Sequence, residues 1–143
     1  MQLTADSARQ RVSEARVLRL ATVDADGSPH QVPATFAAQG DTLVIAVDHK
    51  PKRHQNLKRL RNIAANPKVC VLVDRYDDDW SQLWWARGDG TARVLEGDAR
   101  RGPVEWLSEK YEQYRDHPPE GPVIEITITR WTGWAFADPG RRE

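Results

Sequence analysis

The sequence predicts a mainly β protein of the α+β type, a small antiparallel barrel with helices at its periphery. After a first short helix, the expected elements run strand, strand, strand, helix, strand, strand, helix, strand. The connections between the strands are mostly short turns, whereas each parallel pair would need a long crossover. The 143 residues suffice for one ordinary domain. These observations favour a small closed barrel, with residues 1–143 as a single domain.

The first third of the chain is expected to form a helix and three strands. A polar helix covers residues 6–16, with Asp6 or Ser7 as its N-terminal cap. Asp26 and Gly27 lie in the first turn and provide the positive-φ residues that a tight hairpin turn requires. The three strands cover residues 17–23, 29–38 and 42–48.

The rest of the chain alternates between strands and amphipathic helices. Leu57, Leu60, Ile63 and Ala64 follow a helical spacing, and Asn66-Pro67 ends that helix. The segments that follow are a buried strand (68–74), a polar connection (76–81), a strand pair or one long bent strand (83–95), a helix opened by Pro103 (103–115), a stiff linker (117–122) and a last strand (123–136).

The composition is that of a soluble globular protein, with 21 basic and 21 acidic residues that cancel. No apolar run is long enough to cross a bilayer, and the N-terminal residues contain no hydrophobic signal region. We therefore expect a cytoplasmic protein without membrane contact. The single cysteine, Cys70, lies in an apolar run and is expected to be inert in a buried strand.

The usual catalytic patterns are missing from the sequence. The four histidines have no metal-ligand spacing, so no metal site is expected. No nucleophile elbow, zinc-protease or Walker motif occurs. The glycines of RGDG (87–90) are typical of a turn or bulge, and the acidic residues 77–79 of a solvated loop. Catalytic residues are therefore unknown from the sequence.

Positive charge is concentrated in the stretch DHKPKRHQNLKRLRN, residues 48–62, which carries six Lys or Arg residues against one Asp. Lys58, Arg59 and Arg61 occupy the polar face of the expected helix, where a solvated role is the simpler interpretation. Lys50, Lys52 and Arg53 lie between a strand and the helix N-terminus. There the unpaired backbone N–H groups and the helix dipole also attract an anion. Their position favours a phosphate site over a plain surface cluster.

A nucleic acid is a poor match for this anion. A protein that follows a phosphate backbone usually has a wide basic surface and a basic isoelectric point, and this chain is neutral. The six tryptophans lie mostly in expected strands or an amphipathic helix, where core or interface roles are favoured over base stacking. A small anionic ligand is expected instead.

The chain resembles the split-barrel superfamily of pyridoxamine 5′-phosphate oxidase. The resemblance rests on ATVDADGSPHQVP (21–33), DHKPKRHQNL (48–57) and NPKVCVLVD (66–74), in the order and spacing of that superfamily. The stretch from residue 48 to residue 94 is similar to actinobacterial members that depend on coenzyme F420, a deazaflavin. The resemblance implies a split β-barrel of the FMN-binding type and a homodimer with its cofactor sites at the subunit interface.

The resemblance also implies cofactor-binding positions. In the superfamily's phosphate loop, Pro51 falls on the Ser, and Lys52 and Arg53 fall on the Arg and Lys. The complete set of implied cofactor-binding residues is Thr22, Pro33, Thr35, Val47, Asp48, Lys50, Pro51, Lys52, Arg53 and Trp85. Trp84 and Trp85 are adjacent in a strand and must point to opposite faces. One is expected to pack inside the barrel and the other to reach the dimer or cofactor surface.

This sequence departs from the oxidase at several positions. Val32 stands where the oxidase has an arginine on its second strand, and the oxidase glutamine that contacts the flavin falls near Trp85. Residues that bind pyridoxal phosphate have no clear counterpart, so oxidation of vitamin B6 is not expected. The resemblance implies an F420-dependent oxidoreductase that exchanges a hydride with a flat conjugated organic substrate. The alternatives are an FMN-binding oxidoreductase, a tetrapyrrole-binding protein and a non-enzymatic cofactor carrier.

Overall fold

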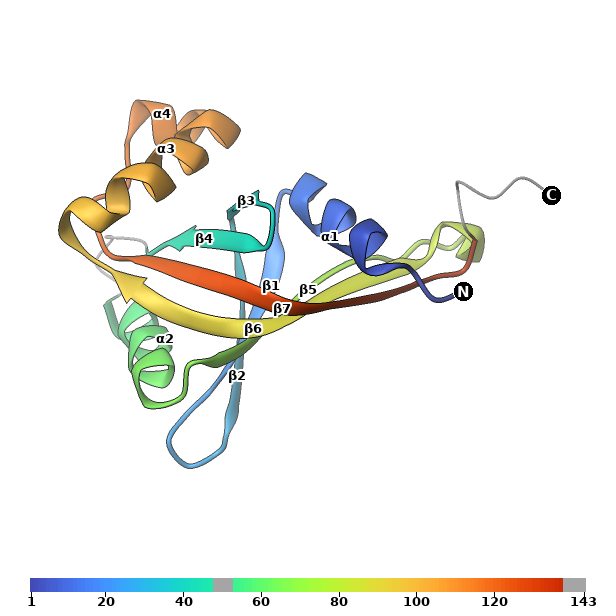
Figure 1. The fold of residues 1–143 in the computed structure, drawn as a ribbon, viewed down its shortest axis with the longest axis horizontal. Helices are drawn as coiled ribbons and strands as arrows, with labels where there is room; N and C mark the ends of the chain where they lie inside the picture. The colour runs from blue at the N-terminus through green and yellow to red at the C-terminus, as the bar shows by residue number, and fades with distance from the viewer. Residues whose placement is uncertain (48–52, 138–143) are drawn as a thin grey trace.

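The computed structural model describes residues 1–47 and 53–137, and for residues 53–57 it describes the backbone alone. In this part of the chain, seven strands form one antiparallel sheet in the order β2-β1-β5-β6-β7-β4-β3 (Figure 1). The strands are β1 (Leu18–Val23), β2 (Pro29–Ala34), β3 (Ala37–Gln39), β4 (Thr42–Ala46), β5 (Lys68–Arg75), β6 (Trp84–Leu95) and β7 (Val123–Ala135). The α-helices are α1 (Ala5–Glu14), α2 (Arg53–Ala65), α3 (Arg101–Lys110) and α4 (Glu112–Asp116), with short 3-10 helices at Trp80–Gln82 and Gly97–Arg100.

Strands β2 and β3 lie at opposite edges of the sheet, yet only Thr35 and Phe36 separate them in the chain. Because an extended residue spans at most about 3.6 Å, the two edges approach within roughly 11 Å and the sheet must roll into a barrel. No ladder joins β2 to β3 within the described ranges, so the barrel is split along this seam. The predicted antiparallel split barrel is confirmed. The complete closure expected from the strand pattern is not present, because the chain crosses the seam here instead of pairing across it.

The core fills the inside of the barrel because alternate side chains of each strand point inward. In β1, Leu18, Leu20 and Thr22 are buried, whereas Arg19 between them is exposed. Other strands fill the interior with Leu43, Ile45, Val69, Val71, Val73, Ala86, Ile124, Ile126 and Ile128.

Helices α1 and α2 lie on opposite sides of the long strands β6 and β7 (Figure 1). Helix α1 adds Ala8 and Val12 to the barrel core, and α2 adds Ile63. Beside Ile63, the side-chain amide of Asn62 donates a hydrogen bond of 3.1 Å to the hydroxyl of Thr22. This bond satisfies two buried polar groups and ties α2 to the barrel wall.

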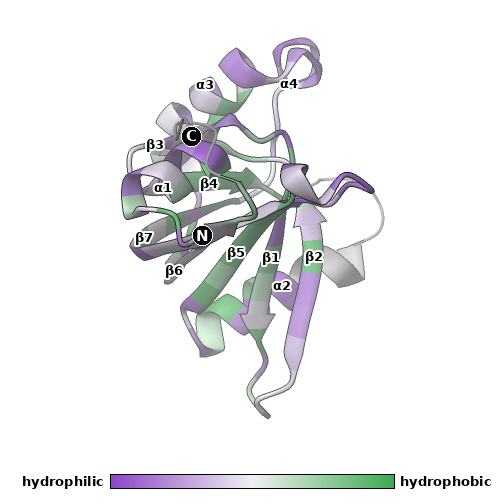
Figure 2. Ribbon diagram, turned by 90° about the vertical axis from the view of Figure 1, so that its right-hand side faces the viewer, coloured by the Kyte–Doolittle hydropathy of each residue, from purple (hydrophilic) through white to green (hydrophobic). Residues whose placement is uncertain are grey.

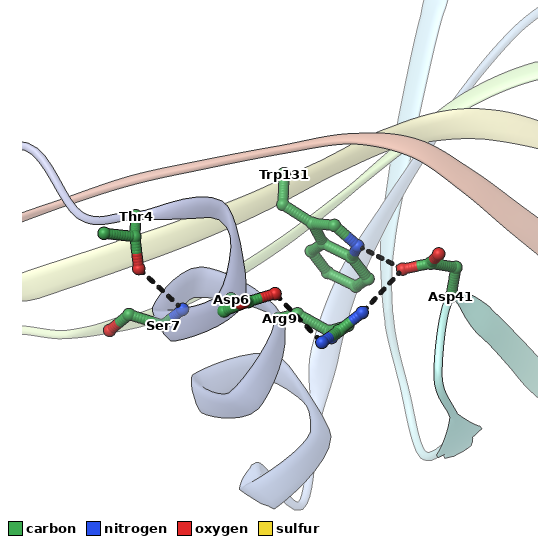
Figure 3. A network of polar contacts seen from close by, with 6 residues as sticks. All are labelled: Thr4, Asp6, Ser7, Arg9, Asp41 and Trp131. Atoms are coloured by element: carbon green, nitrogen blue, oxygen red, sulfur yellow. Dashed lines mark hydrogen bonds and ion pairs between the residues drawn. The ribbon is translucent and has the colours of Figure 1, made fainter.

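A polar network holds α1 against the barrel (Figure 3). Asp41, in the turn between β3 and β4, accepts a 2.8 Å hydrogen bond from the indole N–H of Trp131. The same carboxylate oxygen is 3.5 Å from the guanidinium of Arg9, which also pairs with Asp6 at 3.0 Å. Helix α1 is thereby fixed to β7 and to the β3–β4 turn.

Helix α3 packs on the outer side of β4 and forms a second, smaller core. Leu107 and Tyr111 are buried there against Val44 and Val123. The hydroxyl of Tyr111 accepts from the backbone N–H of Phe36 at 3.2 Å and donates to the carbonyl of Arg16 at 2.6 Å. One side chain therefore connects α3 to the split seam and to the start of β1.

The element boundaries differ from the sequence expectation at three places. Thr4, rather than Asp6 or Ser7, caps α1 by accepting a hydrogen bond from the backbone of Ser7. The strand expected at 29–38 is divided, because the chain changes from one sheet edge to the other. The helix expected at 103–115 begins at Arg101 and is interrupted at Tyr111, whose backbone is extended.

Candidate functional site: the outer face of the barrel and the β4–α2 segment

The expected phosphate loop lies between the end of β4 and the start of α2. Val47 follows β4 as a buried residue, and its backbone N–H donates to the carbonyl of Pro122 at 3.0 Å. Asp48, Lys50, Pro51 and Lys52 lie outside the described residues. Helix α2 begins at Arg53, whose side chain is likewise outside the description. The backbone therefore has the strand–loop–helix order that the sequence analysis expects around this segment.

The remaining cations of the basic stretch lie along α2. Lys58 and Arg61 are exposed, and Arg59 is half-buried. Such positions are typical of the polar face of a surface helix. They extend the positive charge from the helix start toward its C-terminal end.

Strands β2, β1, β5, β6 and β7 have one side that points away from the barrel core. We call this side the outer face throughout. Figure 2 shows the mostly hydrophobic β5 beside β1 and the more hydrophilic β2. Residues directly opposite each other on antiparallel strands project to the same side. The registers therefore place one row of side chains across this face, in the order Pro33, Arg19, Leu72, Arg87 and Thr132.

Aromatic side chains continue the outer face toward the ends of β6 and β7. Trp85 lies directly opposite Trp134, which is 38% exposed. Trp134 makes an edge-to-face contact with Phe136, which is 51% exposed. Exposed aromatic surface of this kind usually marks a binding or association surface.

Two polar atoms on the outer face are buried without a hydrogen-bond partner. They are Nε of Arg87 and Oγ1 of Thr132, which belong to cross-strand neighbours. The Arg87 guanidinium lies 5.8 Å from the Trp85 ring centroid, and Arg87 Nε is 3.3 Å from a carboxylate oxygen of Asp89. Buried polar atoms are normally paired, so Thr132 Oγ1 remains available to a bound molecule or a second chain, whereas Arg87 Nε has Asp89 as its ion-pair partner.

Cys70 lies on the outer face and not in the barrel interior. Burial of the thiol, together with the negative charge of Asp89, raises its pKa to about 11. The thiolate is the nucleophilic form of cysteine, so the group is unreactive near neutral pH.

The residues implied by the resemblance occupy different environments. Pro33 and Trp85 are both on the outer face, but β1 and β5 separate their strands, which puts them roughly 14 Å apart. Thr22 and Val47 are buried in the barrel. Thr35 lies at the split seam, where its hydroxyl is 2.9 Å from the hydroxyl of Tyr114.

The structure assigns the two adjacent tryptophans to opposite sides. Trp84 packs against the barrel core, and the Arg11 guanidinium lies 4.9 Å from its ring centroid. Trp85 belongs to the outer face, beside Arg87 and opposite Trp134. Trp85 is thus the member of the pair that can contact a cofactor or a second subunit.

Sequence reasoning favours a core or interface role for the tryptophans, Trp134 included, but it missed Arg87 and Thr132 as members of this face. The signal for Arg87 is present, because it stands two residues after Trp85 in a strand and must share its side. Pairing of Thr132 with Arg87 depends on the register of β6 against β7, which the sequence does not reveal.

Two kinds of feature are absent from the described residues. These residues contain no group of three or more His, Cys, Asp or Glu side chains that could hold a metal ion. Within the same residues, no helix is both long and apolar enough to span a bilayer.

The fold and the position of the β4–α2 segment define a split-barrel protein. The sequence matches the pyridoxamine 5′-phosphate oxidase family over residues 4–135, and the chain belongs to that family. No curated protein sequence matches the chain.

Solved structures with the same fold share about a fifth of their residues with this chain. A FAD-binding protein from Mesorhizobium loti is 21% identical with a TM-score of 0.72, and 93% of this chain and 95% of that one are covered. The FAD binding protein from Mycobacterium smegmatis is 20% identical with a TM-score of 0.66, covering 96% and 100%. HutZ, the heme storage protein from Vibrio cholerae, is 21% identical with a TM-score of 0.66, covering 91% and 90%.

Proposed function

We propose that this protein is an oxidoreductase that binds a flavin-type cofactor, coenzyme F420, and exchanges a hydride between it and a flat conjugated organic substrate. The observation that carries the proposal is the order of β4, the cationic loop and α2 in a member of this family. A helix start beside three cations is suited to a phosphate group. The deazaflavin supplies the hydride chemistry when bound, which accounts for a chain without an evident acid–base set.

The outer face fits the remainder of such a cofactor. Trp85 offers a flat apolar surface, and the buried Thr132 Oγ1 has no hydrogen-bond partner in the described chain. Arg87 lies beside Trp85, with its Nε paired to Asp89. A conjugated ring system with polar edges can pack on Trp85 and pair with the Thr132 hydroxyl. A partner subunit against this face would complete the site and exclude water from it.

The charge pattern favours F420 over FMN. FMN ends in one phosphate, whereas F420 continues through a phosphodiester to lactate and glutamates with several negative charges. Beyond the loop, Lys58 and Arg61 offer exposed cations along α2. Val32, half-buried against the barrel core, stands where the oxidase has a phosphate-binding arginine. The chain therefore has more cations along α2 for a long anionic tail, and one cation fewer at the position where the oxidase binds the FMN phosphate.

A fluorescence titration with F420 and FMN at two salt concentrations tests this preference. F420 should bind more tightly, and its affinity should fall with salt because exposed charges are screened beyond about 10 Å at 0.1 M. Equal affinity for FMN, or purification as a yellow stoichiometric complex, would instead assign the chain to the FMN-binding oxidoreductases.

Removal of Lys52 and Arg53 tests the phosphate loop. Each charge-assisted hydrogen bond contributes roughly 1.5–3 kcal/mol, so the double alanine variant should bind F420 about two to four orders of magnitude more weakly. Lys58→Ala is the matched control, because that side chain is exposed on α2 and its loss should change the affinity far less. Unchanged affinity in the double variant would refute the loop assignment.

Tetrapyrrole binding is the second candidate, favoured by the similarity to a heme storage protein. Visible spectra after incubation with heme, FMN and F420 separate the three ligands, since heme gives a Soret band and the others do not. Turnover of reduced F420 with an electron acceptor distinguishes an enzyme from a cofactor carrier.

A further inference from the structure

A cavity of about 620 Å³ lies between the C-terminal half of α1 and the ends of β5 and β6. Pockets for small organic ligands measure about 300–1,000 Å³. The cavity is distinct from the proposed cofactor loop. Val47, which precedes that loop, pairs with Pro122 beside the Leu95 end of β6, whereas the cavity borders Trp84 at the opposite end of the same strand.

Two arginines line this cavity, and each stacks on an aromatic ring. Arg11 lies 4.9 Å from the ring centroid of Trp84, and Arg16 lies 4.6 Å from that of Tyr111. Stacking occupies the flat face of a guanidinium and leaves its in-plane N–H groups available, as bidentate binding of a carboxylate requires. No ion pair between described residues involves either arginine.

Two carboxylates, Glu14 and Asp74, also line the cavity, but no ion pair between described residues joins either of them to Arg11 or Arg16. Glu14 instead accepts a 3.1 Å hydrogen bond from the side-chain amide of Gln10. Asp74 is exposed at the end of β5, where water solvates its carboxylate. The apolar part of the lining comes from Val17, Val73 and the indole of Trp84. The cavity thus combines an aromatic wall with two cationic groups at its border.

The wall that carries Arg11 is held in place before any ligand binds. Helix α1 is fixed by the Asp41, Arg9 and Trp131 contacts seen in Figure 3 and by the burial of Val12 in the core. Trp84 packs against the same core. Binding therefore requires little ordering of the chain, which favours affinity.

We propose that this cavity binds a flat aromatic carboxylate, whose ring packs against Trp84 and the two valines and whose carboxylate pairs with Arg11 and Arg16. The site is separate from the proposed phosphate loop. An aromatic acid matches the two arginines because a neutral ring would leave both guanidinium groups unpaired, and an aromatic cation would leave them unpaired and add a like charge beside them.

Three probes of the same ring system test the charge preference: 2-naphthoate, the neutral 2-naphthamide and the cationic 2-naphthylmethylammonium. In calorimetric titrations of the full chain, 2-naphthoate should bind about tenfold more tightly than the neutral probe, the effect of one net charge-assisted hydrogen bond, and the cation more weakly still. The NMR signal of the Trp84 indole N–H should shift on titration with 2-naphthoate. Equal binding of all three probes, or no binding of 2-naphthoate, would overturn the proposal.

Variants locate the binding. Arg11→Gln should weaken 2-naphthoate binding about tenfold while affinity for the neutral probe changes little. Arg101→Gln removes the same charge from an exposed position on α3 and should change neither affinity. Both side chains are on helix surfaces, so unchanged melting temperatures should verify that the folds are intact. Equal 2-naphthoate affinity in Arg11→Gln and wild type would refute the site.

Discussion

Lys110 is a half-buried ammonium group held between three elements of the fold. Its Nζ donates a 2.6 Å hydrogen bond to the carbonyl of Ala15 and lies 3.8 Å from the ring centroid of Phe36. Burial, together with the positive charge of Arg16, lowers the pKa of Lys110 from 10.5 to about 8. The ring of Phe36 favours the charged form, but desolvation outweighs that attraction.

The pKa of Lys110 predicts a pH dependence of stability. Between about pH 8 and pH 10.5 the unfolded chain keeps a proton on this lysine that the folded chain has lost, so the free energy of unfolding rises with pH. Wild type should therefore gain stability relative to Lys110→Met across this window, in urea unfolding measured at several pH values. The comparison cancels the titration of Tyr111, whose pKa is raised by burial, because both proteins contain this tyrosine. If the free energy of unfolding changed with pH equally in the two proteins, the lowered pKa of Lys110 would be contradicted.

At the scale of elements, the pairing of β6 with β7 depends on a glycine. The register shifts between Asp89 and Gly90, where Thr129 of β7 is the extra, unpaired residue of a bulge. A Cβ at Gly90 would overlap the backbone carbonyl oxygen of Thr127, and no rotation of a side chain can relieve that contact. The close approach of the two strands therefore requires glycine at this position.

Gly90→Ala should destabilise the protein by more than about 2 kcal/mol, since β6 and β7 must separate or slip. Gly102→Ala is the matched control, because a Cβ in the first turn of α3 meets nothing within 4 Å. That substitution should leave stability unchanged or raise it by up to about 1 kcal/mol. Urea denaturation measures both variants, and a Gly90→Ala protein as stable as wild type would show that the bulge can relax.

Elements with strong local signals were predictable from the sequence, and elements shaped by distant contacts were not. Apolar residues recur at strand spacing in β1 and at helix spacing in α2, and the structure contains both elements. The break at Thr35 and Phe36 has no local signal, because it arises where one edge of the rolled sheet meets the other. Likewise, the interruption after Lys110 places the Tyr111 hydroxyl against Phe36 and Arg16, residues about 75 and 95 positions away in the chain.

The candidate site likewise contains residues with a local signal in the sequence and residues that only the fold brings together. A local charge pattern marks Lys50, Lys52 and Arg53, although the first two lie outside the described residues. The resemblance places Thr22 near a cofactor, whereas the strand alternation turns its side chain into the barrel, where Asn62 donates to it. Arg87 and Thr132 become neighbours only through sheet register.

At the scale of the whole molecule, the outer face indicates a homodimer, which we propose as the functional unit. Leu72, Trp85 and Trp134 give this face apolar and aromatic surface, and Thr132 Oγ1 has no hydrogen-bond partner on it. A second copy can cover the apolar groups and offer a partner to the Thr132 hydroxyl. Because both copies would present the same surface, the association would follow a two-fold axis.

Leu72→Glu tests the dimer while sparing the fold of the subunit. The registers place Leu72 between Arg19 and Arg87, so a glutamate there gains two cationic neighbours within its own chain. Across a two-fold interface, the same glutamate would lose hydration, and the apolar contact of the leucine would be lost. Light scattering and sedimentation at micromolar concentration should therefore give a dimer for wild type and a folded monomer for Leu72→Glu. Ala99→Glu, in the exposed turn before α3, adds the same charge and should remain dimeric. A monomeric wild type, or a Leu72→Glu protein that still dimerises, would exclude the outer face as the interface and with it a cofactor site shared between two subunits.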